Sequence, residues 1–144
     1  MTLPRDELIP IGSLSMRFFV DGRDTDGHMA MAEMVIQPGA KVPPPHRHAE
    51  VDETIHVIEG SLTYRVDDET RVLSVGDQCF SRRGSVHHFA NPGETPARVL
   101  VVFSPAHIGP AYFREIADVL GAGGPPDMSR MKAVMTKHGI ELAP

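Results

Sequence analysis

Residues 39–60 read GAKVPPPHRHAEVDETIHVIEG, a segment in which His46 and His48 stand two residues apart and Glu53 follows shortly afterwards. Side chains two residues apart leave an extended strand on the same face, so the two imidazoles can share one ion. The four residues between His48 and Glu53 suffice for a short bend and a return, which can bring the carboxylate to the same point. The spacing therefore indicates a metal site.

A second segment, residues 76–91, reads GDQCFSRRGSVHHFAN and contains a further candidate ligand. His87 follows a turn led by Gly84 and opens an expected strand that ends in Asn-Pro-Gly. A barrel of short strands brings distant segments together, so His87 can lie beside the first histidine pair. By strand alternation, His88 faces away from the metal, whereas Phe89 shares the face of His87 and should pack in the metal chamber.

The chain from Leu14 to about Ala106 has the pattern of an antiparallel sandwich or barrel, because short apolar segments are interrupted by turn residues every eight to twelve positions. Within Thr54 to Ile58, His56 lies on the strand face opposite to Glu53, which places it outside the metal chamber. The expected strands are Leu14 to Val20, Met29 to Ile36, Thr54 to Ile58, Leu62 to Val66, Arg71 to Val75, Gln78 to Ser81, His87 to Ala90 and Arg98 to Phe103.

Beyond Pro105 the apolar periodicity changes to about 3.6 residues, which predicts two short helices. Pro110 can open the first helix and Gly121 can close it. Asp127 can serve as N-cap of the second helix, which should end at Gly139. The apolar positions of the second helix are interpreted as core packing; they are Met128, Met131, Val134 and Met135.

Length, charge and composition favour one globular domain that handles a small molecule. A chain of 144 residues fits one core, and a net charge of -5 without a Lys/Arg run argues against binding to nucleic acid. No apolar segment approaches the length of a membrane span, and no secretion signal opens the sequence, so we expect a cytoplasmic protein without membrane partners. Cys79 is the only cysteine, which excludes an intramolecular disulfide.

The two histidine segments resemble the two sequence motifs of the cupin superfamily. The first motif is matched by His46, His48, Glu53 and Gly60, and the second by Gly76, Gly84, His87 and Asn91. Fifteen residues separate the motifs, as in the shortest cupins, and Arg82 stands where the second motif usually has Pro. The approach to His46 and the tail from Tyr112 to Pro126 extend the resemblance to bacterial single-domain cupins labelled quercetin dioxygenase-like.

This resemblance implies an all-β fold, the cupin double-stranded β-helix or jelly-roll barrel, over residues 1–108. Residues 109–144 would form a helical extension packed on that barrel. One divalent metal ion per chain (Fe, Mn, Ni, Co or Zn) would be held by His46, His48, Glu53 and His87. The expected partner is a small-molecule substrate, and the expected assembly is a homodimer.

The same resemblance implies a metal-dependent enzyme of the dioxygenase type acting on an enol, a flavonol or a β-diketone-like compound, with Glu53 as the catalytic general base. Two alternatives fit the same ligands: a non-oxidative isomerase, cyclase or lyase, and a non-catalytic small-molecule-binding protein. Tyr64, Arg65 and Tyr112 are candidate substrate contacts whose side-chain directions the sequence leaves open.

Overall fold

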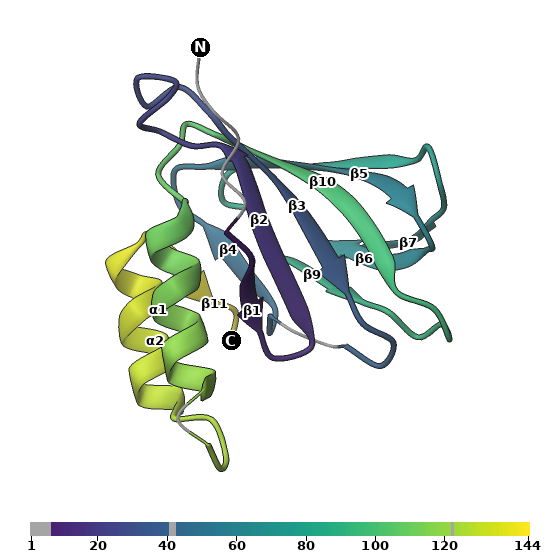
Figure 1. The fold of residues 1–144 in the computed structure, drawn as a ribbon. Coiled ribbons are helices and arrows are strands. Elements are labelled where there is room, and N and C mark those ends of the chain that lie inside the picture. Colours follow the sequence, from purple (N-terminus) through teal and green to yellow (C-terminus); the bar gives the residue numbers. More distant parts are fainter. Residues whose placement is uncertain (1–6, 41–42, 122) are drawn as a thin grey trace.

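A computed structural model describes residues 7–40, 43–121 and 123–144 and places their strands in two sheets that face each other (Figure 1). The larger sheet has the order β1-β2-β3-β10-β5-β8, and the smaller sheet has the order β11-β4-β9-β6-β7. The strands of the larger sheet are β1 (Ile9–Ile11), β2 (Leu14–Val20), β3 (Ala30–Ile36), β5 (Asp52–Glu59), β8 (Gln78–Ser81) and β10 (Ala97–Ser104). Those of the smaller sheet are β4 (His46–His48), β6 (Leu62–Val66), β7 (Glu69–Leu73), β9 (His87–Ala90) and β11 (Ile140–Leu142).

The core lies between the two sheets because every second residue of the long strands is apolar and points inward. In β10, the residues Val99, Val101 and Phe103 are at most 2% exposed, while their neighbours in sequence face outward. β3 repeats the alternation with Ala32, Met34 and Ile36. This period of two is the pattern expected for strands that bury one face.

The all-β double-stranded β-helix predicted from the sequence is confirmed, but the two sheets do not close into a barrel. In the part of the chain that the structure describes, no strand ladder joins the edge strands β1 and β8 to the smaller sheet. The sheets are instead held together by the stacking of their apolar faces, as in a sandwich.

Four predicted strands have the observed bounds, and β3, β5 and β10 differ from the prediction by one or two residues at their ends. β1 and β11 were not predicted because three residues are too few to show a period. β7 begins at Glu69, two residues before the predicted start, because four of its five residues are exposed and carry no inward pattern. Its position is set by the turn at Asp67, whose φ of 50° lies in the left-handed region.

One glycine of the first motif has a steric role at the end of β5. Gly60 has a φ of +76°, and a Cβ added there would lie 2.5 Å from the carbonyl oxygen of Pro96. A side chain at this position would therefore collide with backbone as well as strain the turn. Gly60 allows β5 to approach the segment that leads into β10.

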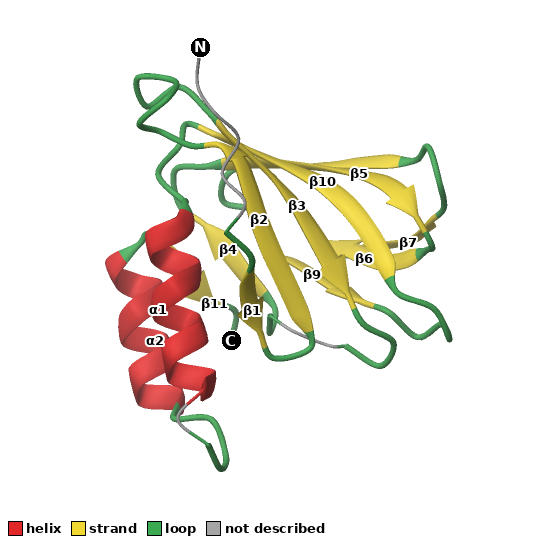
Figure 2. Ribbon diagram, viewed as in Figure 1, coloured by secondary structure: helices red, strands yellow, loops and turns green. Residues whose placement is uncertain are grey.

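The two helices, α1 (Pro110–Gly121) and α2 (Met128–Lys137), were both predicted and lie side by side at one end of the sheets (Figure 2). Asp127 caps α2, since its Oδ1 accepts a hydrogen bond of 3.1 Å from the backbone N–H of Arg130. Glu115 of α1 joins the helices through Lys137 (2.7 Å) and His138 (3.2 Å). No helix in the described ranges is long and apolar enough to cross a membrane.

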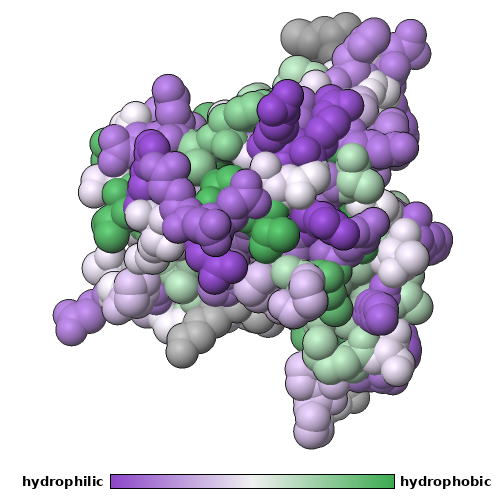
Figure 3. Space-filling model, turned by 180° about the vertical axis from the view of Figure 1, so that it is seen from behind, coloured by the Kyte–Doolittle hydropathy of each residue, from purple (hydrophilic) through white to green (hydrophobic). Residues whose placement is uncertain are grey.

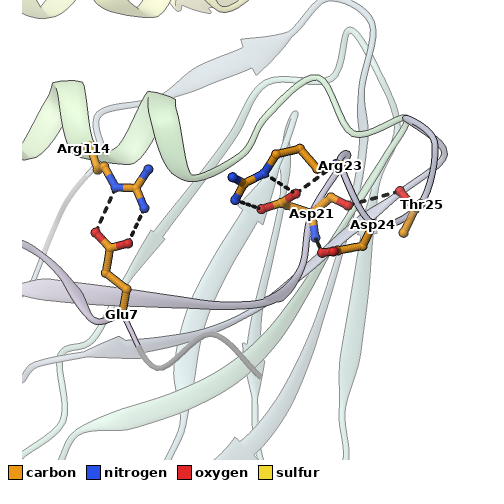
Figure 4. A network of polar contacts seen from close by, with 6 residues as sticks. All are labelled: Glu7, Asp21, Arg23, Asp24, Thr25 and Arg114. Carbon is orange, nitrogen blue, oxygen red and sulfur yellow. Dashed lines mark hydrogen bonds and ion pairs between the residues drawn. The ribbon is translucent and has the colours of Figure 1, made fainter. Parts of the chain in front are cut away.

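Polar contacts hold α1 to the N-terminal part of the chain (Figure 4). The guanidinium of Arg114 pairs with the carboxylate of Glu7, which lies just before β1.

In the β2–β3 connection, Asp21 is 2% exposed and accepts hydrogen bonds from the backbone and the guanidinium of Arg23. The buried Asp21 carboxylate is thus paired, and it fixes the turn that follows β2.

The surface seen from behind is largely hydrophilic, with separate hydrophobic areas between the hydrophilic side chains (Figure 3). Among the described residues, the large apolar side chains that are more than half exposed are Leu8, Val72, Val75, Phe80 and Met128. Three of them, Val72, Val75 and Phe80, belong to the edge strands β7 and β8 or the turn between them.

Candidate metal centre

The strand pairing brings the histidines of the two motifs together. His46 and His48 lie at the two ends of β4, and both point inward because Arg47 between them points outward. β4 pairs with β9 so that His46 lies opposite His87. Glu53 comes from β5 of the other sheet, which faces this pair across the core. As the sequence predicted, residues 41 positions apart become neighbours.

Backbone contacts of motif residues fix the two ends of this arrangement. The N–H of Gly84 donates to the carbonyl of His48 (2.8 Å), which ties the turn before β9 to β4. Asn91 donates from its side chain to the carbonyls of Ile36 (3.0 Å) and Thr95 (2.9 Å). β11 pairs with the free side of β4, with Ile140 opposite His48. β4 therefore lies between two ladders and is held in place.

The imidazole and carboxylate groups converge on one point. His46, His48 and His87 each offer a nitrogen, and these three atoms lie within 4.8 Å of one another. Glu53 Oε2 is 2.8 Å from His87 Nε2 and 3.2 Å from His48 Nε2, and the two nitrogens are 3.2 Å apart. All four residues are at most 5% exposed. This buried cluster of His46, His48 and His87 can hold a metal ion.

The electrostatics of the cluster set the protonation state of its members in the absence of a metal ion. Burial and the neighbouring histidines lower the pKa of His46 to about 3, so its imidazole is neutral near pH 7. Burial works to raise the pKa of Glu53, but His87 and His48 hold it well below its usual range. Burial works to lower the pKa of His87, but the Glu53 carboxylate outweighs it and raises this pKa.

The donor set fits a divalent cation. The ring of His46 is oriented by a 2.8 Å hydrogen bond from its Nδ1 to the carbonyl of Pro44, which leaves Nε2 with its lone pair. In a dry site, converging neutral nitrogens and a carboxylate repel one another unless a proton or a cation lies among them. Imidazole and carboxylate are ligands that Fe, Mn, Ni, Co and Zn share, so the set does not select one ion.

A cavity of about 320 Å³ opens onto the cluster and is walled by both sheets and both helices. The two helices and the segment between them contribute Tyr112, Phe113, Ile116, Leu120, Pro126, Met128, Met131 and Met135. The sheets contribute the cluster residues and Ile11, Leu14, Met16, Met34, Phe89, Val101 and Phe103, and the segment before β4 adds Pro43 and Pro44. Its volume lies in the range of small-molecule sites.

The methionine pattern of α2 was interpreted as core packing, which is confirmed for Met131 and Met135, but this interpretation did not include the cavity. Met128, Met131 and Met135 line the chamber, whereas Val134 only packs against the core. Apolar residues at helical spacing indicate that one face of the helix is covered. The spacing is the same whether that face packs against a core or lines a ligand cavity. The sequence holds no signal that separates these two cases.

The remaining predicted residues divide into those inside and those outside the chamber. Phe89 lines it, as predicted, and so does Tyr112. Tyr64 is buried beside the cluster without lining the chamber: its ring centroid is 6.2 Å from those of His87 and Phe89, and its hydroxyl is 3.1 Å from Ser81 Oγ. Arg65 is exposed and donates to the carbonyl of Asp67. His56 pairs with Leu100 of β10 and lies on the outward face of β5.

The fold and the buried histidine cluster define a double-stranded β-helix protein with a site that can hold a metal ion. The sequence comparison gives the family. Residues 32–103, half of the chain, match the family described as Cupin domain. The chain belongs to the cupin family.

Individual relatives are more distant. The chain is 27% identical over 106 residues to alginate biosynthesis protein AlgA of Pseudomonas aeruginosa, covering 74% of this chain and 22% of that protein. It is 38% identical over 79 residues to tetracenomycin polyketide synthase protein TcmJ of Streptomyces glaucescens, covering 55% and 49%. The chain thus spans about a fifth and about a half of these curated relatives.

A similar solved structure is that of a predicted oxalate decarboxylase from Thermotoga maritima. The TM-score is 0.65 at 22% identity, with 72% of this chain and 99% of that chain covered. At this identity the similarity concerns the fold.

Proposed function

We propose that this chain is a metal-dependent enzyme that acts on a small organic substrate of the enol, flavonol or β-diketone class. The observation that carries the proposal is the convergence of three buried imidazoles and one buried carboxylate at the wall of a cavity of about 320 Å³. A site of this kind combines a cation-binding cluster with room for a ligand beside it.

In this proposal Glu53 is the fourth ligand beside His46, His48 and His87. Four protein ligands leave two positions free on an octahedral ion, so a substrate can bind next to Glu53. A bound divalent ion would supply Lewis acidity and, if it is redox-active, a site for oxygen chemistry.

Glu53 is also the proposed general base. Its carboxylate is ionised because His87 and His48 hold its pKa well below its usual range. Its Oε2 faces the point where the imidazoles converge, within 3.2 Å of two of them. A substrate hydroxyl placed at this point comes within reach of the carboxylate, which can accept its proton. Phe89 and Phe103 line the same chamber and exclude water from the reacting end.

The relative from Streptomyces supports the substrate class. That protein is named as part of a polyketide synthase system, and polyketide chains contain β-diketone units. The similarity covers 55% of this chain. The substrate class is therefore part of the proposal and not a result of the comparison.

The test is oxygen uptake by protein that is purified without an affinity tag and loaded with Fe(II), measured against a panel of flavonols, enols and β-diketones. We expect uptake that needs both metal and substrate. The variant His87→Ala should lose most metal and all uptake, because one of four ligands is gone. The control His56→Ala, on the outward face of β5 in the larger sheet, should keep both.

Two other results would replace the proposal. Substrate conversion without oxygen uptake would assign a non-oxidative isomerase, cyclase or lyase. Binding of the panel compounds with no conversion under any metal would assign a small-molecule-binding protein.

A further inference from the structure

We propose that the substrate of this site is a neutral and largely apolar molecule, and that Tyr112 of α1 donates a hydrogen bond to its oxygenated end. This inference rests on the proposed function and makes it more specific, since it names the chemistry of the substrate on the side that does not face the metal cluster.

The chamber wall has an unusual composition for a site that handles a small metabolite. Apart from His46, His48, Glu53 and His87, the described lining residues are aliphatic, aromatic, proline or methionine, and Tyr112 is the one among them with a polar side-chain group. No lysine or arginine lies among these described lining residues. The described part of the wall therefore offers no positively charged side chain to an anionic substituent away from the metal.

Charge then decides which molecules fit. A carboxylate or phosphate that enters this wall away from the metal loses its water and meets no cationic side chain among the described lining residues, which is a cost of several kcal/mol for an unpaired ion. An apolar ring system in the same place gains free energy, at roughly 25 cal/mol for each Å² removed from water. The methionine side chains of α2 can adapt to the outline of such rings, since Met131 and Met135 have flexible, polarisable ends.

Tyr112 is positioned to be the specific contact. Its side chain is 7% exposed and lines the chamber, and no hydrogen bond among the described residues uses its hydroxyl. The hydroxyl is not among the buried side-chain atoms that lack a partner, so it is open to the chamber, where a ligand oxygen can accept its hydrogen bond. Its ring is held between Phe113 (4.9 Å between centroids) and His138 (5.3 Å), and His138 is itself bonded to Glu115.

The binding experiment uses three probes with the metal-loaded chain: naphthalene, which is apolar and has no oxygen; 3-hydroxyflavone, which adds a hydroxy-ketone; and 3-hydroxyflavone with a carboxylate on its phenyl ring, which places a negative charge away from the metal. Dissociation constants are measured by probe fluorescence. We expect 3-hydroxyflavone to bind at least tenfold more tightly than its carboxylate derivative, and naphthalene to bind with or without metal. Tighter binding of the carboxylate derivative than of 3-hydroxyflavone would overturn the inference about substrate class.

Tyr112→Phe isolates the hydroxyl. We expect it to weaken 3-hydroxyflavone roughly three- to tenfold, the effect of one hydrogen bond, and to change naphthalene binding less than twofold. The control Tyr64→Phe removes a buried tyrosine hydroxyl that bonds Ser81 outside the chamber, and it should change neither constant. If Tyr112→Phe weakens both probes equally, or neither, the role assigned to Tyr112 is wrong.

A charge at the rim tests the wall independently. Met128 is half exposed, so Met128→Arg should fold. We expect this variant to bind the carboxylate derivative of 3-hydroxyflavone more tightly and naphthalene more weakly, while Val72→Arg on the exposed strand β7 does neither. The outcomes also separate this inference from the proposed function. If naphthalene binds but metal adds nothing to 3-hydroxyflavone binding, the metal proposal fails while the apolar chamber stands.

Discussion

Glu53 is a buried carboxylate whose negative charge is balanced by two imidazoles within 3.2 Å of its Oε2. Glu53→Gln keeps the size and one coordinating oxygen but removes the charge and the basicity. We expect a moderate loss of metal affinity and a fall in turnover of about 10²–10⁴-fold, the usual contribution of a general base. The rates are compared at equal metal occupancy. Turnover at the parent rate would mean that Glu53 is only a ligand.

The pKa shifts of the cluster predict the pH dependence of metal binding. The pKa of His87 is raised by Glu53, so the metal-free site holds one proton that the metal-loaded site cannot keep. His46, with a pKa of about 3, does not compete. Because the metal-free state binds more protons, affinity should rise with pH and level off above the raised pKa of His87. Calorimetry in buffers of different ionisation enthalpy should detect about one proton released per metal near pH 6.5; no release would contradict this.

Much of the residue-scale site could be predicted from the sequence because it depends on alternation. His46 and His48 share a face, and Phe89 shares the face of His87, since the strand period is two. The direction of Tyr112 could not be predicted, because it depends on how α1 docks against β1 and not on the helix period alone.

At the scale of elements, β11 is the strand whose role was least visible in the sequence. Its three residues show no period, yet Ile140 is 1% exposed and lies opposite His48, so β11 supports the strand that carries two histidines. The smaller sheet thus depends on the end of the helical extension. The apolar face of α2 was predicted from the sequence, but the contact of this face with a cavity was not predicted.

Two substitutions in β11 compare burial with surface charge. Ile140→Ala should lower the free energy of unfolding by about 2–5 kcal/mol, the usual cost of a truncated core residue. Glu141→Ala removes an exposed pair with Arg47 and should change it by less than about 1 kcal/mol. Urea unfolding of both variants measures the difference. Equal effects would show that β11 is held by the surface pair instead of by packing.

At the scale of the whole molecule, we expect a homodimer that pairs through the N-terminal strands and the outer face of the larger sheet. That face carries apolar side chains that are only partly buried in one chain, including Val35, Leu100 and Val102. Light scattering at micromolar concentration should give about twice 15.7 kDa. A mass of one chain would exclude the dimer under these conditions.

The fold class could be predicted from sequence patterns because each long strand buries one face. The open edges between the two sheets could not be predicted in this way. Whether β1 and β8 pair with the smaller sheet depends on the spacing and twist of the two sheets. These are properties of the packed core, to which residues such as Phe18 and Phe103 contribute through ring contacts at 6.5 Å. A pattern read along one strand contains no information about them.

The position of the bound ion tests the central claim most directly. Crystals of protein loaded with Mn, Fe, Co, Ni or Zn are measured at the absorption edge of the metal, and the anomalous signal locates it. We expect one ion per chain, about 2.0–2.2 Å from a nitrogen of His46, His48 and His87 and from a carboxylate oxygen of Glu53. An ion bound elsewhere, or no ion in crystals soaked at a metal concentration that saturates other sites, would contradict the account.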